Sequence, residues 1–160
     1  MDLGVCIERN AALGHSPFLR VFGGFEKVKA VRTIFGARTD TVLRNLSVEI
    51  SDGRGYMRIN DVKGSIVINA KYLKEGKELD VYLDVIHELV HIRQHHEGKE
   101  LWDKGYKYID RPTEIEAYKV AVKEARRLGL SDEQLAEYLK VEWIPEEEFR
   151  SFLENVGVKS

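Results

Sequence analysis

The chain contains one cysteine, Cys6, and this excludes an internal disulfide bond. It also lacks any apolar run that approaches the ~20 residues needed for a membrane-spanning helix. The opening residues, MDLGVCIERN, have neither the basic start nor the long apolar core of a signal peptide. These absences predict a reducing, cytoplasmic setting and no membrane partner.

The net charge is also small, because the chain has 25 Lys and Arg and 27 Asp and Glu, which give a formal net charge of −2 at pH 7. Such a balance presents no basic face, so we expect no nucleic-acid partner. Repeats, low-complexity segments and linkers are missing as well. A chain of 160 residues with 43% hydrophobic residues can bury one core, so we expect residues 1–160 to form a single domain. No feature of the sequence predicts an oligomeric state.

The first half of the chain shows helix signals followed by strand signals. Ser16 and Pro17 predict a helix start, with Ser as the N-cap and Pro at the first helical position. Hydrophobic residues from Phe25 to Phe35 recur at helical spacing until Gly36. Short β-rich runs separated by Gly and Asp then predict strands, joined as in hairpins, at residues 43–50, 56–60 and 65–70.

The second half predicts four helices, each with its own start or stop signal. They run from about 80 to 97, from 111 to 128, from 131 to about 141, and from 145 onward. Asp110 is expected to be the N-cap of the second, and Ser131 with Gln134 forms a capping box for the third. Helix, sheet and then helices, in that order, predict a small α+β domain.

The segment DVIHELVHIRQHHEG, residues 84–98, contains four of the five histidines and the pattern H-E-x-x-H. His87 and His91 are four residues apart, so both imidazoles lie on one helix face and can bind one metal ion. Glu88 lies about 100° round the helix from His87. Its carboxylate would stand beside the metal, where it could take a proton from a water whose pKa zinc lowers to about 7. The alternative is a solvated, histidine-rich face on a regulatory domain without metal.

A catalytic zinc site needs a third protein ligand. His95 lies one turn beyond His91, but a straight helix carries it too far from His87 for an easy shared site. The helix at 111–128 offers Glu114, which falls in the middle of its apolar face, where a carboxylate is costly unless it is paired or bound to metal. The alternative for Glu114 is a first-turn glutamate stabilised by the helix dipole. Glu116 falls on the opposite, basic side of this helix and is expected to be solvated.

The motif HELVH at 87–91, followed by EIEAY at 114–118, resembles the gluzincins, zinc metallopeptidases with two His on one helix and a Glu on the next. The resemblance covers about residues 65–128. It implies a zincin-like fold, with an N-terminal helix and a small twisted sheet ahead of the metal-binding helix and a helical C-terminal half. Tyr118 departs from the family pattern, which has Asp or Asn at that position.

The resemblance also implies a site and a substrate. Zn²⁺ would be bound by His87, His91 and Glu114, with Glu88 as the catalytic base in hydrolysis of a peptide or protein substrate. The strand SIVIN, residues 65–69, would be either the rim that pairs with extended substrate or an ordinary core strand. Tyr106 and Tyr108, in the irregular segment between the two helices, would either pack over the cleft or stabilise an oxyanion. The alternative function is a catalytically silent zincin scaffold with a binding or regulatory role.

Overall fold

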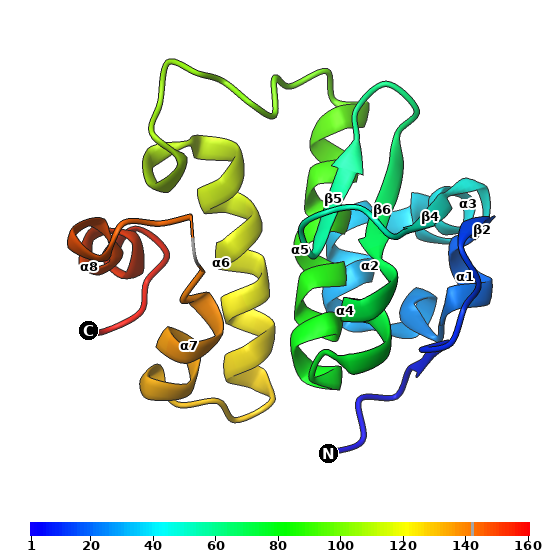
Figure 1. Ribbon diagram of the computed structural model, residues 1–160, viewed down its shortest axis with the longest axis horizontal. Coiled ribbons are helices and arrows are strands. Elements are labelled where there is room, and N and C mark those ends of the chain that lie inside the picture. The colour runs from blue at the N-terminus through cyan, green and yellow to red at the C-terminus, as the bar shows by residue number, and fades with distance from the viewer. Residues whose placement is uncertain (142) are drawn as a thin grey trace.

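The computed structural model describes residues 1–141 and 143–160, which form an α+β fold with a helical C-terminal half (Figure 1). The strands are β1 (Cys6–Ile7), β2 (Gly14–Pro17), β3 (Phe22–Gly23), β4 (Ser47–Ser51), β5 (Met57–Asn60) and β6 (Ser65–Asn69). The α-helices are α1 (Phe18–Val21), α2 (Lys29–Phe35), α3 (Thr39–Asn45), α4 (Ala70–Glu75), α5 (Glu78–His96), α6 (Pro112–Arg127), α7 (Asp132–Leu139) and α8 (Glu146–Asn155). Short 3-10 turns are η1 (Phe25–Lys27), η2 (Gly36–Arg38) and η3 (Tyr108–Asp110).

The main sheet has the strand order β2-β4-β6-β5, and β1 pairs with β3 in a separate two-stranded sheet. Strand β6 runs parallel to β4 and antiparallel to β5. Its apolar run Ile66, Val67 and Ile68 is buried, as expected for a strand with neighbours on both sides. The SIVIN segment is therefore an interior strand, so the alternative of an ordinary core strand is confirmed and that of a substrate-pairing rim is wrong. The outer strand on that side of the sheet is β5.

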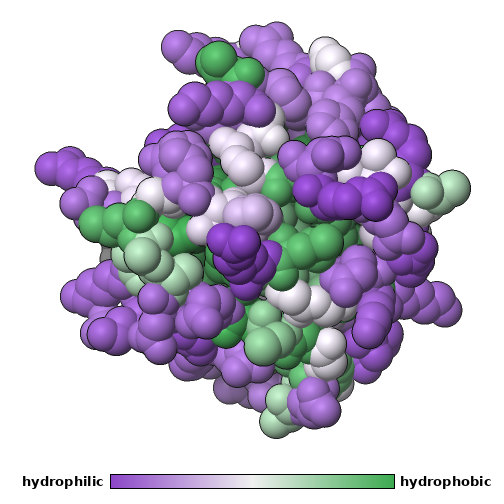
Figure 2. Space-filling view, turned by 90° about the vertical axis from the view of Figure 1, so that its right-hand side faces the viewer, coloured by the Kyte–Doolittle hydropathy of each residue, from purple (hydrophilic) through white to green (hydrophobic). Residues whose placement is uncertain are grey.

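The core of the N-terminal half lies between the sheet, the short helices and α5. Phe18, Phe22 and Phe25 pack against one another with ring centroids 5.2–6.0 Å apart. Tyr82 of α5 joins this cluster, 5.5 Å from Phe25. The outer face of this half is mainly hydrophilic, with some hydrophobic side chains showing between the polar ones (Figure 2).

Helix α5 lies between the N-terminal half and α6 (Figure 1). Twelve of its 19 residues are buried, so it is covered on more than one side. Beyond its end, Gly98 adopts φ +76, the left-handed conformation that glycine accepts without strain. Helix α6 packs beside α5, and its small residues Ala117, Ala121 and Ala125 are fully buried. Because these side chains are small, the two helices can approach closely.

Several predicted element boundaries are confirmed. The capping box of Ser131 and Gln134 is formed at the start of α7. Pro112 occupies the first turn of α6, and Pro145 precedes α8. Among the described residues, no helix is both long enough and apolar enough to cross a membrane.

Other boundaries are wrong. Ser16 is not an N-cap, because it lies in β2, where it pairs with Val48 of β4, and the helix begins at Phe18. Residues 43–45 complete α3 rather than a strand. Asp110 belongs to a 3-10 turn and accepts a hydrogen bond from Asn155 Nδ2 at 3.1 Å, so it does not cap α6.

Two α-helices, α3 and α4, were not predicted. Helix α4 follows β6 directly, and the Asn69 side chain caps it by accepting from the Tyr72 backbone N–H at 2.9 Å. This cap fixes the first turn of α4, which carries Tyr72 to the cleft described below.

Candidate metal centre

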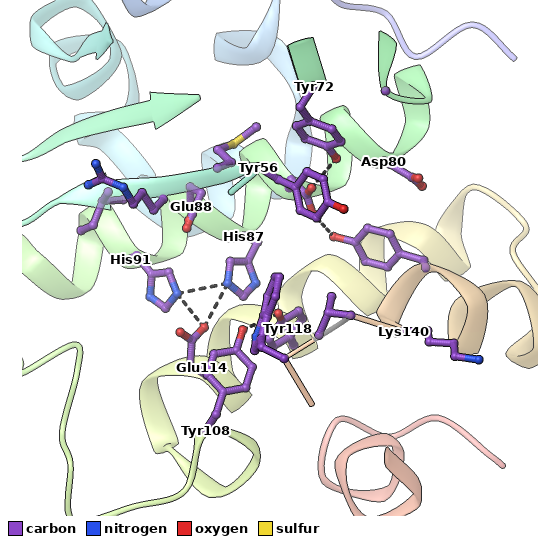
Figure 3. A pocket seen from close by; sticks show the side chains of 18 of the residues that line it. Tyr56, Tyr72, Asp80, His87, Glu88, His91, Tyr108, Glu114, Tyr118 and Lys140 are labelled. Carbon is purple, nitrogen blue, oxygen red and sulfur yellow. Dashed lines mark hydrogen bonds and ion pairs between the residues drawn. The ribbon is translucent and has the colours of Figure 1, made fainter. Parts of the chain in front are cut away.

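Two imidazoles and one carboxylate converge between α5 and α6 (Figure 3). Glu114 Oε1 lies 3.1 Å from His87 Nε2 and 2.9 Å from His91 Nε2. The two imidazole nitrogens are 3.1 Å apart. Helix α5 supplies the two histidines one turn apart, and the first turn of α6 supplies Glu114. The structure thus brings together residues that are 27 positions apart in the chain.

All four residues of the predicted site are buried. The exposed fractions are 8% for His87, 6% for Glu88, 5% for His91 and 7% for Glu114. A buried carboxylate is unfavourable unless a cation or several donors compensate it. The energetic cost of this cluster can be offset by a proton on a histidine or by a metal ion.

The hydrogen bonds of His91 show which of its ring nitrogens faces Glu114. Gln94 Nε2 donates to Thr113 O at 3.0 Å and to Glu116 Oε1 at 2.7 Å, so its amide oxygen faces His91. His91 Nδ1 therefore donates to Gln94 Oε1 at 2.7 Å. In a neutral imidazole this leaves a lone pair on His91 Nε2, directed at Glu114 Oε1 and His87 Nε2. Three acceptors at such distances repel one another unless a proton or a metal ion lies between them, so the donor set fits a metal.

Burial and the contacts within this cluster shift the pKa values of His87, His91 and Glu114. Burial lowers the pKa of His87. Burial also acts to lower the pKa of His91, but its hydrogen bond with Glu114 and the nearby Glu88 charge outweigh it and raise this pKa to about 9. Burial acts to raise the pKa of Glu114, yet its contacts with both histidines hold it well below its ordinary value. A metal ion that binds here competes with a proton for the same nitrogen.

Glu88 lies on the other side of the imidazoles from Glu114 (Figure 3). Ligand atoms of His87, Glu88 and His91 all lie within 4.8 Å of one another, so this buried group could hold a metal ion. Of the two carboxylates, however, Glu114 contacts both imidazoles. Glu88 Oε2 is buried without a hydrogen-bond partner among the described residues. Burial raises the pKa of Glu88 to about 8.

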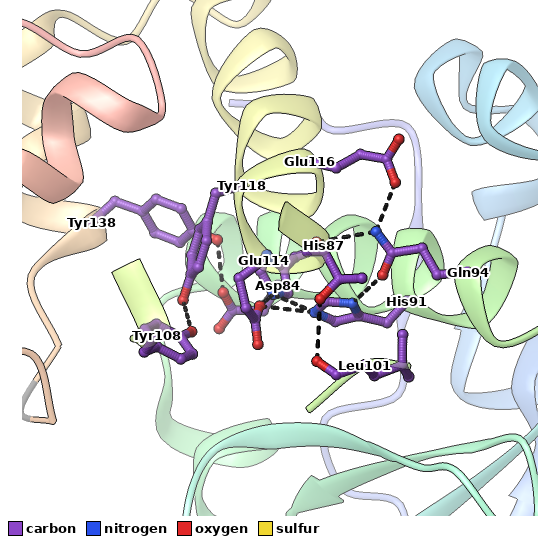
Figure 4. Close-up of polar contacts among 11 residues, drawn as sticks. Asp84, His87, His91, Gln94, Leu101, Tyr108, Glu114, Glu116, Tyr118 and Tyr138 are labelled. Atoms are coloured by element: carbon purple, nitrogen blue, oxygen red, sulfur yellow. Dashed lines mark hydrogen bonds and ion pairs between the residues drawn. The ribbon is translucent and has the colours of Figure 1, made fainter. Parts of the chain in front are cut away.

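Gln94 contacts His91 on the side away from Glu114, and Glu116 contacts Gln94 in turn (Figure 4). Sequence reasoning did not identify either role. Glu116 is 42% exposed, and it contacts Arg93 Nη2 at 2.8 Å in addition to Gln94. Glu116 is therefore partly solvated, as expected, but its contacts with Arg93 and Gln94 of α5 were not predicted. The only available signal was the spacing of Gln94, three residues after His91, which places both on one helix face.

Tyr118 packs against the other histidine. Its ring centroid lies 4.2 Å from that of His87, and its hydroxyl lies 2.5 Å from the Tyr108 hydroxyl (Figure 4). His87 Nδ1 is buried and has no hydrogen-bond partner among the described residues. On the side away from Glu114, His87 is thus held by aromatic packing, while His91 is held by a hydrogen bond to Gln94.

The centre opens into a cleft of about 420 Å³. Its walls come from β5, from α5 and α6, and from α7 with the segment that follows it. Trp102 and Trp143, which are 41% and 52% exposed, line it as well. The remaining histidines of residues 84–98 do not reach the centre, because His95 lines a separate pocket with Asp61 and His96 is exposed.

No protein-family model, curated protein or solved structure matches this chain. The class of protein therefore rests on the site itself, which is a buried His-Glu-His group with H-E-x-x-H spacing on a helix and a second glutamate beside it.

Proposed function

We propose that the chain is a zinc-dependent peptidase of the gluzincin type, with a zincin-like arrangement in which residues 1–160 act as one domain. His87, His91 and Glu114 would hold the ion. The observation that carries this proposal is the convergence of their three ligand atoms within 3.1 Å of one another. Two neutral imidazoles and one carboxylate are a donor set that zinc prefers in catalytic sites.

When bound, zinc supplies a Lewis acid that polarises a substrate carbonyl and lowers the pKa of a water. Glu88 is the proton carrier in this proposal. Its buried Oε2 has no hydrogen-bond partner among the described residues, and burial raises its pKa to about 8, near enough to neutrality for the group both to take up and to release a proton. Glu88 would accept a proton at Oε2 and then donate it to the leaving amine.

The cleft gives an extended peptide a place to bind. Met57, Arg58 and Ile59 of β5 line it, and β5 pairs with β6 along one side only within the described residues. The other side of β5 can accept backbone hydrogen bonds from an added strand, which is a general mode of peptide binding. The exposed thiol of Cys6 fits the reducing cytoplasm in which we place the enzyme.

The test is hydrolysis of a broad peptide library by zinc-loaded protein, compared with Glu88→Gln. We expect chelator-sensitive cleavage by the native chain and its loss in the variant, with zinc content unchanged. Cleavage that survives the substitution would assign the chemistry to another group. If neither form cleaves while both hold zinc, the scaffold serves binding or regulation instead.

A further inference from the structure

A second polar cluster lies in the same cleft, one turn of α5 away from the metal centre. Asp84 Oδ2 accepts a hydrogen bond from the Tyr72 hydroxyl at 2.5 Å, and Asp84 Oδ1 accepts one from the Tyr138 hydroxyl at 2.7 Å. Tyr72 comes from α4 and Tyr138 from α7, so the carboxylate lies between two walls of the cleft. All three residues line the cleft and are partly accessible.

This carboxylate has no cationic partner among the described residues. Within the described residues, neither Asp84 nor Asp80 forms an ion pair, although both line the cleft. Lys77, at the same end, is 76% exposed and lies 3.9 Å from Glu137, and its charge also acts on Asp80 from beyond ion-pair distance. Burial raises the pKa of Asp84 to about 6, since two tyrosine hydroxyls compensate it only in part.

The acidic residues form a line along α5. Asp80, Asp84 and Glu88 are spaced four apart, so they share one helix face, where like charges disfavour one another. Glu88, at the inner end of this line, also lines the cleft, and its Oε2 has no hydrogen-bond partner among the described residues. A cation between Asp80 and Asp84 would relieve this repulsion and complete the hydrogen bonding of both carboxylates.

Aromatic rings surround the same position. Tyr56 lies 4.9 Å from Tyr72, centroid to centroid, and is 47% exposed in the cleft (Figure 3). With Tyr138, three tyrosines face the space beside Asp84. Aromatic faces attract ammonium and guanidinium groups, and such rings combined with a carboxylate are a recurrent way of recognising a cation.

We propose that this end of the cleft binds the cationic group of a substrate, either a lysine or arginine side chain or a free N-terminal amine, with Asp84 as the anionic contact and Tyr56 as the aromatic one. The inference rests on the peptidase function proposed above and names its substrate preference. Asp84 lies about 6 Å along the helix axis from Glu88. The four-carbon stem of a lysine next to the cleaved bond can bridge that separation.

The test begins with cleavage-site mapping of a mixed library of N-acetylated peptides by zinc-loaded protein. Matched peptides with lysine or norleucine at the preferred position then give kcat/KM for each. We expect lysine to exceed norleucine at least tenfold in the native chain, and the ratio to fall below threefold in Asp84→Asn. A norleucine peptide with a free N-terminus, compared with its acetylated form, identifies the amine as the source instead.

Glu124→Gln is the matched control. Glu124 is also a buried carboxylate that accepts a tyrosine hydroxyl, from Tyr82 at 2.5 Å, but it does not line the cleft. This variant should keep the native ratio. A native lysine-to-norleucine ratio near one, with no preference for the free amine, would overturn the inference, and so would a preference that survives Asp84→Asn.

A failure of the peptidase proposal can be distinguished from a failure of the subsite by measuring binding. If no peptide is cleaved, calorimetry with the same peptides and zinc-loaded Glu88→Gln measures binding alone. Tighter binding of the lysine or free-amine peptide, lost in the Glu88→Gln, Asp84→Asn double variant, would support the subsite without the chemistry. Equal binding of all peptides would reject the subsite.

Discussion

At the scale of single residues, the centre depends on one shared oxygen, because Glu114 Oε1 contacts both imidazoles. We predict that Glu114→Gln weakens zinc binding at least tenfold, since a neutral amide replaces a charged ligand. Glu116→Gln is the matched control, two residues away. Its amide oxygen can still accept from Gln94, so we expect less than a threefold change. Competitive zinc titration measures both, and the reverse order would transfer the ligand assignment to Glu116.

The ionisation of Asp84 gives a second prediction. Its folded pKa is about 6, above the ordinary value of 3.8, so the folded state holds the proton more tightly. The resulting stabilisation is complete below about pH 4 and is lost as the pH rises through about 6. Relative to Asp84→Asn, the native free energy of unfolding should fall across this window, by at most about 3 kcal/mol. Urea titrations across the window measure it, and parallel pH profiles would show that Asp84 ionises normally.

The sequence predicted the contacting residues of the centre but not those that orient them. Glu114 could be singled out because a carboxylate on an apolar helix face needs a partner. Gln94 could not, because its partners are the Thr113 carbonyl and the Glu116 carboxylate on another helix. The hydrogen bonds from Tyr72 and Tyr138 to Asp84 likewise depend on tertiary packing, which no local pattern encodes.

At the scale of elements, the distance between α5 and α6 sets the geometry of the centre. Ala121 is fully buried in α6. We predict that Ala121→Leu destabilises the fold by about 1–3 kcal/mol through overpacking and also weakens zinc binding, because it displaces Glu114 relative to the histidines. Chemical denaturation and zinc titration give the two values. Destabilisation without any change in zinc affinity would mean that the helix spacing does not control the site.

Element types were predicted better than their pairing. The long helices with strong periodicity and clear stop signals, such as the one closed by Gly98, lie close to their predicted bounds. Strand pairing was predicted less well, because β5 lies beyond β6 instead of forming a hairpin with β4. Local turn residues indicate where a strand ends but not which neighbour it joins. Ser16-Pro17 shows the same limit, since pairing with β4 outweighs a good helix-start signal.

At the scale of the whole molecule, a metal that joins α5 to α6 should stabilise the fold. A ligand present at 100 times its Kd adds about 2.7 kcal/mol, which corresponds to roughly 5–10 °C in Tm for a chain of this size. We therefore predict that chelation lowers Tm by about that amount and that added zinc restores it. Differential scanning calorimetry measures the shift. His87→Ala should show no response to zinc, and an equal response would place the stabilising metal elsewhere.

The most direct test of the central claim is the zinc content of the native protein, purified without chelator and measured by elemental analysis beside His87→Ala. We predict about one zinc per native chain and almost none in the variant, because His87 supplies one of three converging ligand atoms. Equal zinc in the two proteins, or none in the native one after zinc is supplied, would contradict the assignment of this centre as a zinc site.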